Sequence, residues 1–271
     1  MSNLIDVGPG APQTMLATLY AKALDAESDH PVLGDTYARD LVRSMSYDWS
    51  RTGMTARLAA VTMRTAHFDG WAREFLSAHD EATVLHLGCG LDSRFFRIQP
   101  GPGVLWYDVD YPEVIALRSQ FYPSRGQYRL ISASVTDAEW LATIPVDRPV
   151  LVVAEGLTMY LDKADGLALF RRIVNRFPSG ELQFDAFNRV GLAAEKLNGV
   201  VRGSGSTLRW AVDGPDDILS EIPTVRLMSA MAASDASTFA HVPCRYRVAS
   251  RVMSVLPALK MMAQFHRYAF S

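Results

Sequence analysis

Hydrophobic and polar residues follow two different patterns along this chain, and the change comes near residue 80. Before it, apolar residues recur at the three- and four-residue spacing of helices that face a core. This spacing predicts three helices, over residues 14–26, 35–45 and 55–78, with the third broken or bent near Gly70. The first 80 residues are therefore expected to form a helical lead-in.

After residue 80, short apolar runs alternate with segments of helical pattern. Helices are predicted over 112–121 and 163–177, among others. Strand and helix in repeated order are typical of a parallel sheet with helices on both faces. The apolar runs predict seven strands, over residues 83–87, 104–109, 127–132, 149–154, 181–187, 224–230 and 262–269.

The composition of individual strands predicts their places in the sheet. The strands at 83–87 and 149–154 are apolar almost throughout, which indicates the sheet interior. The last two apolar runs, at 224–230 and 262–269, are spaced more like the strands of a meander than like strands joined by a helix. They predict an antiparallel edge. Residues 202–206, Arg-Gly-Ser-Gly-Ser, predict a flexible loop or lid rather than a linker. We therefore expect an α/β fold in which residues 1–271 form one domain.

The composition of the chain excludes several function classes. Of 271 residues, 49% are hydrophobic and 21% charged, as in an ordinary soluble protein. The net charge of −2 offers no basic surface to a nucleic acid. The sequence contains neither a membrane-spanning apolar run nor a signal-peptide pattern. Cys89 and Cys244 fit neither a disulfide framework nor a zinc cluster. We expect a cytoplasmic protein with no nucleic-acid partner, no membrane contact and no metal.

The residues that indicate chemistry lie where the first two strands end. Residues 84–94, Val-Leu-His-Leu-Gly-Cys-Gly-Leu-Asp-Ser-Arg, form an apolar strand followed by a glycine turn. Asp110 ends the second strand, 22 residues after Gly88. A carboxylate there accepts hydrogen bonds from a ribose, while glycines let the backbone approach a ligand closely. The two features together predict a cofactor that contains a nucleoside.

The residues after the glycines indicate which nucleoside cofactor is bound. In a nicotinamide site, the third glycine of G-x-G-x-x-G lets a helix begin against the diphosphate. Ser93 stands at that position here, and Asp92 precedes it. A carboxylate at this turn repels a diphosphate but tolerates a cationic sulfonium or amino group. A nicotinamide-dependent oxidoreductase is therefore disfavoured, although it stays open as an alternative.

Three motifs carry a family resemblance. Residues 87–94 (LGCGLDSR) resemble the LGxGLDTR turn of the leucine carboxyl methyltransferase family. Residues 109–114 (VDYPEV) and 154–161 (AEGLTMYL) resemble its VDxPEV and AEGLxMYL segments. Residues 15–37 are similar to the helical start of its bacterial, TcmP-like branch, which includes polyketide-tailoring O-methyltransferases. The resemblance extends from about residue 14 to the C-terminus.

This resemblance implies a fold and a cofactor. The fold would be the Rossmann-like, seven-stranded methyltransferase sheet, and the cofactor S-adenosylmethionine. Residues 83–187 would bind the cofactor, and residues 188–271 would supply the acceptor side and the last strands. Tyr160 would either pack in the core or line the acceptor pocket and position the acceptor. The implied cofactor contacts are Gly88 and Gly90 (methionine portion), Asp110 (ribose), Ser134 and Val135 (adenine), Glu155 (amino group), and Lys22 and Arg64 (methionine carboxylate).

Two positions depart from the pattern. Ser134 stands where the family commonly has an aspartate before the adenine-contacting segment, which implies a weaker adenine contact. His86 stands where many methyltransferases carry an acid just before the glycine turn. We expect His86 to be packed and hydrogen-bonded rather than catalytic.

The resemblance implies methyl transfer to an oxygen of a small molecule, with a polyketide-like acid as the expected acceptor. A carboxylate acceptor is ionised at neutral pH and needs no base, whereas a phenol with a pKa of about 10 does. The six histidines are scattered, and neither His67 nor His241 belongs to a recognisable motif, which favours a carboxylate over a hydroxyl. A non-catalytic relative that binds the cofactor is the second alternative. The sequence does not predict the oligomeric state.

Overall fold

The computed structural model describes residues 5–6, 13–54, 58–196, 207–242, 244, 247–248, 251 and 255–271. The predicted loop at 202–206 lies outside the described residues, as do the first three residues of the predicted helix at 55–78. No helix among the described residues is long and apolar enough to cross a membrane.

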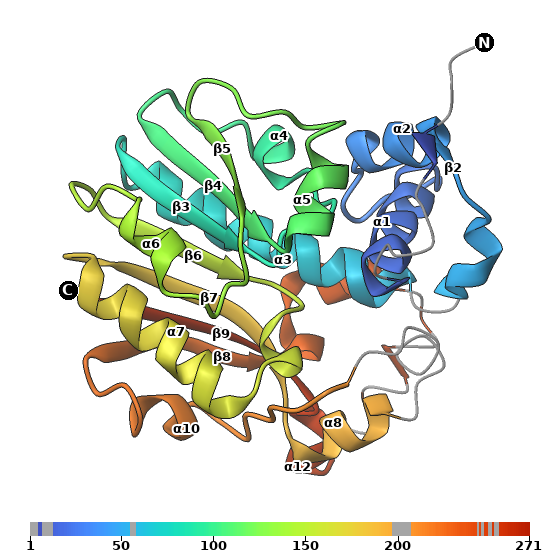
Figure 1. The fold of residues 1–271 in the computed structure, drawn as a ribbon. Helices are drawn as coiled ribbons and strands as arrows, with labels where there is room; N and C mark the ends of the chain where they lie inside the picture. The colour runs from blue at the N-terminus through green and yellow to red at the C-terminus, as the bar shows by residue number, and fades with distance from the viewer. Residues whose placement is uncertain are drawn as a thin grey trace.

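A seven-stranded sheet forms the centre of the fold (Figure 1). Its strand order is β5-β4-β3-β6-β7-β9-β8. The first five strands in this order run parallel, and β9 runs antiparallel to both β7 and β8. The seven predicted strands and the predicted antiparallel edge are confirmed. The strands are β3 (Ala82–Leu87), β4 (Val104–Asp110), β5 (Tyr128–Ser132), β6 (Val150–Ala154), β7 (Gly180–Phe187), β8 (Val225–Ala232) and β9 (Ala263–Phe270).

The chain changes the side on which it adds strands between β3 and β6, although these two strands run parallel. From β3 the chain adds β4 and β5 on one side, then returns to add β6 and β7 on the other. Both β3 and β6 are buried along their whole length, as predicted for interior strands. Ligands of open α/β sheets bind at the carboxyl ends of the strands beside such a change of side. The glycine turn follows β3 and Glu155 follows β6 at this point.

Helices cover both faces of the sheet, as predicted (Figure 1). One face carries α3 (Leu58–Ser77), α4 (Arg94–Ile98) and α5 (Pro112–Arg118). The other face carries α6 (Glu139–Ala142), α7 (Lys163–Arg176) and α10 (Asp216–Leu219). Because neighbouring residues of a strand point to opposite faces, β3 contributes to both hydrophobic cores, the first beneath α3, α4 and α5 and the second beneath α6, α7 and α10. On β3, Val84 packs in the first core and Leu85 in the second.

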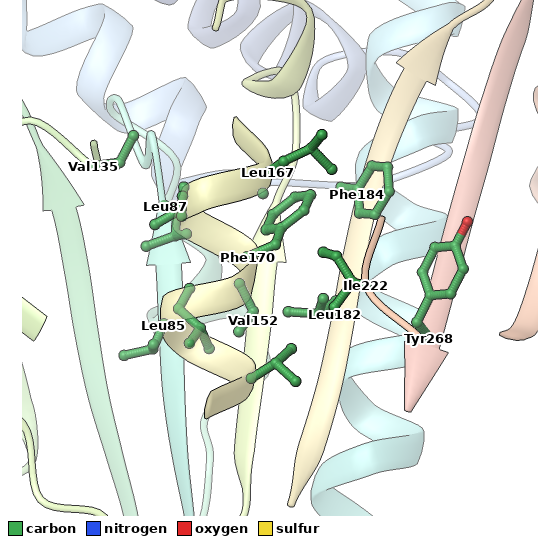
Figure 2. Packing of buried hydrophobic residues seen from close by; sticks show 14 of the residues in the cluster. Leu85, Leu87, Val135, Val152, Leu167, Phe170, Leu182, Phe184, Ile222 and Tyr268 are labelled. Atoms are coloured by element: carbon green, nitrogen blue, oxygen red, sulfur yellow. The ribbon is translucent and has the colours of Figure 1, made fainter. Parts of the chain in front are cut away.

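The second core shows how α7 is held on the sheet. Leu167 and Phe170 of α7 lie against Leu85, Val152 and Phe184 of three neighbouring strands (Figure 2). These side chains are buried, and each contributes about 1.5–3 kcal/mol of transfer free energy when taken out of water. This packing fixes the sheet on which the site is built.

The helical lead-in consists of α1 (Gln13–Ala26), α2 (Thr36–Ser44) and α3. Asp35 begins α2 by accepting a hydrogen bond from the backbone N–H of Ala38 at 3.1 Å. A break or a bend was predicted near Gly70, and the break is wrong, because α3 runs through this residue without interruption. Burial of the neighbouring Phe68 and Trp71 outweighs the weak helix propensity of glycine. A two-residue parallel pair, β1 (Ile5–Asp6) with β2 (Met45–Ser46), was not predicted.

Candidate active site

The glycine turn after β3 is tied directly to the end of β4. Gly88 and Gly90 have φ angles of +63° and +51°, a region in which residues with side chains are strained. The N–H of Gly90 donates to Oδ2 of Asp110 at 2.7 Å. An added Cβ at Gly88 would lie 3.1 Å from Leu157, so the turn packs closely against the segment after β6. The predicted turn and the predicted acid therefore form one wall.

Asp110 is a half-buried carboxylate with spare hydrogen-bonding capacity. Its Oδ1 accepts a hydrogen bond from the N–H of Tyr111 at 2.8 Å, while Oδ2 accepts from Gly90. Burial raises the pKa of Asp110, and these two backbone N–H groups only partly oppose the change. Since each carboxylate oxygen accepts two hydrogen bonds, both oxygens have a lone pair left for a hydroxyl donor.

A cavity of about 750 Å³ lies at the carboxyl ends of β3, β4, β6 and β7, with α1 and α3 on its other side. Its volume is within the roughly 300–1,000 Å³ range of small-molecule sites. The structure brings most of the predicted site residues together in its lining. These are Lys22, Arg64, Gly88, Gly90, Asp110, Glu155 and Tyr160.

Glu155 is the centre of a buried ionic cluster. Its Oε1 accepts hydrogen bonds from Arg64 Nε at 2.9 Å and from Thr65 Oγ1 at 2.8 Å. Its Oε2 pairs with the guanidinium of Arg94. Burial would raise the pKa of Glu155, but Arg94 and Arg64 outweigh burial and lower it to about 2. Glu155 is therefore a fixed negative charge at the cavity.

Lys22 reaches the same cluster from α1. Its Nζ lies 3.1 Å from Oδ2 of Asp92, a residue of the glycine turn. Arg97 also donates to Asp92, at 3.0 Å. Lys22 is only 5% exposed, so it is not a solvated surface charge. The pair joins the helical lead-in to the turn.

Ser134 and Val135 do not line the cavity. Ser134 Oγ lies 2.7 Å from Thr136 Oγ1, in a local hydrogen bond. Val135 is buried in the second core, and Trp140 Nε1 donates to its carbonyl oxygen at 3.3 Å. The contact of these two residues with an adenine stays a prediction.

Tyr160 lines the cavity from the short helix η3 (Thr158–Tyr160) and also packs against a small apolar cluster. Burial raises the pKa of its hydroxyl, which keeps the group neutral. Tyr160 therefore combines the two roles that the sequence left open, packing and cavity lining.

His86 is packed and hydrogen-bonded, as predicted. Its Nδ1 lies 2.9 Å from Oδ1 of Asp108, and Arg94 Nη1 lies 3.2 Å from its Nε2. Because an arginine only donates, Nε2 is the acceptor and Nδ1 carries the proton toward Asp108. Both ring nitrogens are thus engaged below the turn.

Asp185 is a cavity residue that the sequence analysis did not single out. It lies near the end of β7, next to the strand that carries Glu155, and is 4% exposed. Its two oxygens accept from Arg64 Nη1 at 2.8 Å and from the N–H of Gly156 at 2.6 Å. The available signal is an acid near the carboxyl end of the predicted strand at 181–187.

Among the described residues, no group of His, Cys, Asp and Glu side chains is arranged to hold a metal ion.

Comparison with known proteins identifies a family. The family model of leucine carboxyl methyltransferases matches residues 14–174. The chain is 42% identical to the tetracenomycin polyketide synthesis O-methyltransferase TcmP of Streptomyces glaucescens, over 96% of this chain and 97% of TcmP. It is 37% identical to the S-adenosyl-L-methionine-dependent methyltransferase dpfgK of Gibberella zeae, over 82% of each chain.

A solved structure supports the fold. A DUF574 family protein of Streptomyces avermitilis superposes with a TM-score of 0.64 at 12% identity, covering 98% of this chain and 100% of the other. At this identity the likeness concerns the fold alone. The family match and the two sequence relatives show that the chain belongs to the leucine carboxyl methyltransferase family, in its TcmP-like branch.

Proposed function

We propose that this protein is an S-adenosylmethionine-dependent O-methyltransferase that acts on a small acid, with a polyketide-like carboxylate as the acceptor. The observation that carries the proposal is the cavity, in which the glycine turn and Asp110 meet the buried ionic cluster around Glu155. Family membership and the names of TcmP and dpfgK support the reaction type and the cofactor.

The residues of the cavity fit this cofactor. Asp110 has free lone pairs for the two ribose hydroxyls. Gly88 and Gly90 both line the cavity, and their left-handed backbone forms the tight turn beside Asp110. Arg64 and Lys22 supply cations for a carboxylate, and the acids paired with them suit an amino group. An amino-acid group is zwitterionic, so it enters this cluster without changing the balance of charge.

When bound, S-adenosylmethionine supplies a methyl group on a positively charged sulfur for in-line transfer to an oxygen. The protein's part is to align the acceptor and to exclude water. Apolar side chains from several elements also line the cavity, and Tyr160 packs in one cluster with most of them. They are Met159, Phe187, Leu208 and Phe265.

The state of His86 bears on the acceptor. His86 is the one histidine among the described residues that line the cavity, and it is therefore the candidate base there. Both of its ring nitrogens are hydrogen-bonded within the protein. A phenol would need a base, whereas a carboxylate is already ionised. This favours a carboxylate acceptor, with catalysis by positioning.

The two alternatives are not supported. A nicotinamide cofactor would bring a diphosphate to a turn that carries the ionised Asp92. The relatives are methyltransferases by name, which disfavours both an oxidoreductase and a non-catalytic protein. We expect the enzyme to act in the cytoplasm without a nucleic-acid partner, given its two free cysteines and net charge of −2.

Methyl transfer from radiolabelled S-adenosylmethionine to a panel of aromatic carboxylic acids and phenols tests the proposal. We expect label in a product that releases methanol in alkali, because an ester hydrolyses there and an ether does not. Label stable to alkali would identify a hydroxyl acceptor instead. Absence of transfer across the panel, with cofactor bound, would favour the non-catalytic alternative.

A further inference from the structure

Arg64 is held by acids from two neighbouring strands. Its Nε donates to Glu155, which follows β6, and its Nη1 donates to Asp185 on β7. The two acids engage two different edges of the planar guanidinium. The two bonds together therefore hold the plane of the guanidinium in one orientation.

The third support for Arg64 is Gly156. This residue has a φ of +69°, and an added Cβ would lie 3.2 Å from Arg64 Nη2. Its N–H donates to Asp185, so the same acid holds both the guanidinium and the turn beside it. Asp185 therefore fixes the distance between Arg64 and the segment after β6.

Arg64 keeps donors that these contacts do not use. A guanidinium has five N–H groups, and the bonds to Glu155 and Asp185 engage two of them. The side chain is 20% exposed and lines the cavity. The free N–H groups are thus available to an anion in the cavity.

Stability does not explain why an acid stands at position 185. Burial raises the pKa of Asp185, and Arg64 and the N–H of Gly156 only partly compensate. A buried ion pair is weak evidence for stability, since an apolar pair of similar size often serves folding as well. Glu155 already balances the charge of Arg64. The second acid, Asp185, therefore serves mainly to fix the orientation of the guanidinium.

We infer that Asp185 is a positioning residue, which orients the guanidinium of Arg64 toward the carboxylate of the cofactor's amino-acid group. This inference rests on the proposed function. It predicts that Asp185 matters for ligands with that carboxylate and not for ligands without it.

The test compares the dissociation constants of two ligands for the full-length protein. S-adenosylhomocysteine carries the amino-acid group, whereas 5′-methylthioadenosine has the nucleoside and sulfur but no carboxylate. For Asp185→Asn we expect about a tenfold or greater loss of affinity for the first ligand. Affinity for the second should stay within about twofold. An equal loss of affinity for both ligands would show that Asp185 supports the cavity as a whole and not the amino-acid group, and would overturn the inference.

A matched control lies on the same strand. Glu181 is also a buried acid of β7, paired with Arg267 at 2.8 Å, but near the opposite end of the strand. Glu181→Gln should leave the ratio of the two affinities unchanged. Asp185→Glu keeps the carboxylate one methylene farther out, and we expect it to restore part of the ratio even if the asparagine variant folds poorly.

A double-variant cycle tests whether Asp185 acts through Arg64. In an Arg64→Lys background, Asp185→Asn should have little further effect, because the oriented guanidinium is already absent. An unchanged ratio in Asp185→Asn, or full additivity with Arg64→Lys, overturns the inference while leaving the proposed function intact. Failure of the unaltered protein to bind either ligand overturns both.

Discussion

Asp110 and Gly90 show at the scale of single residues how the turn and the acid depend on each other. The N–H of Gly90 satisfies one oxygen of Asp110 and at the same time fixes the turn. The missing Cβ of Gly90 also makes room for Met15 of α1, whose Cγ would lie 3.1 Å from an added Cβ. One backbone position thus orients the acid and lets the lead-in close over it.

Asp110→Ala should weaken S-adenosylhomocysteine binding by about 1–3 kcal/mol, because it removes charge-assisted hydrogen bonds to the ribose. Isothermal titration calorimetry measures this change. Glu113→Gln is the matched control, since Glu113 is an exposed acid in the first turn of α5. Equal affinities for the alanine variant and the unaltered protein would remove Asp110 from the site.

Individual site residues differed in how far the sequence revealed them. Asp110 and Glu155 were visible because each ends an apolar run. Asp185 lies inside β7, where it alternates with Phe184 and Ala186, so its sequence pattern predicts a strand residue and not a site residue. The bond between Lys22 and Asp92 joins residues that are 70 positions apart, and only the packed fold brings them together. Pairing between distant charges has no local pattern from which to predict it.

At the scale of elements, β9 carries a row of buried polar side chains on one face. Gln264, His266 and Tyr268 alternate along the strand and are hydrogen-bonded to one another. Gln264 Oε1 accepts from Nε2 of His266, and in a neutral ring Nδ1 then accepts from the hydroxyl of Tyr268. His266 also stacks on Phe184, with ring centroids 5.2 Å apart. Burial of this row favours the neutral imidazole.

Stability should consequently fall in mild acid. Burial lowers the pKa of His266 to about 4, with Asp217 opposing, whereas an unfolded histidine titrates at about 6.5. The unfolded chain therefore binds the extra proton first. The contribution of the neutral His266 to the free energy of unfolding is fully present above a pH of about 6.5. About 3 kcal/mol of it is lost as the pH falls to about 4.

Urea unfolding across this pH range, compared between the unaltered protein and His266→Gln, measures that contribution. The variant should be less stable at neutral pH but should lose less on acidification. His30→Gln provides the control, because His30 is exposed. Parallel pH profiles for the unaltered protein and His266→Gln would contradict the assignment.

Elements were more predictable than residues. Apolar residues that recur every two residues identify strands, and those that recur every three to four residues identify long helices. The seven strands of the sheet could be predicted in this way. The two-residue pair of β1 and β2 is too short for any periodicity. The continuity of α3 through Gly70 depends on the packing of its neighbours, which a local pattern does not contain.

At the scale of the whole molecule, the cavity lies between the helical lead-in and the carboxyl edge of the sheet. The lead-in supplies Met15, Lys22 and Arg64, and the sheet supplies Asp110 and the acids after β6 and on β7. The two parts meet through buried ion pairs rather than through a single motif. The site therefore depends on the complete arrangement of both parts.

Calorimetric titration of the folded, full-length protein with S-adenosylhomocysteine tests the central claim most directly, with NADH as the comparison ligand. We predict saturable binding of S-adenosylhomocysteine and no binding of NADH, because the turn carries Asp92 where a diphosphate would lie. The absence of S-adenosylhomocysteine binding at high micromolar ligand, with the protein folded, would contradict the account.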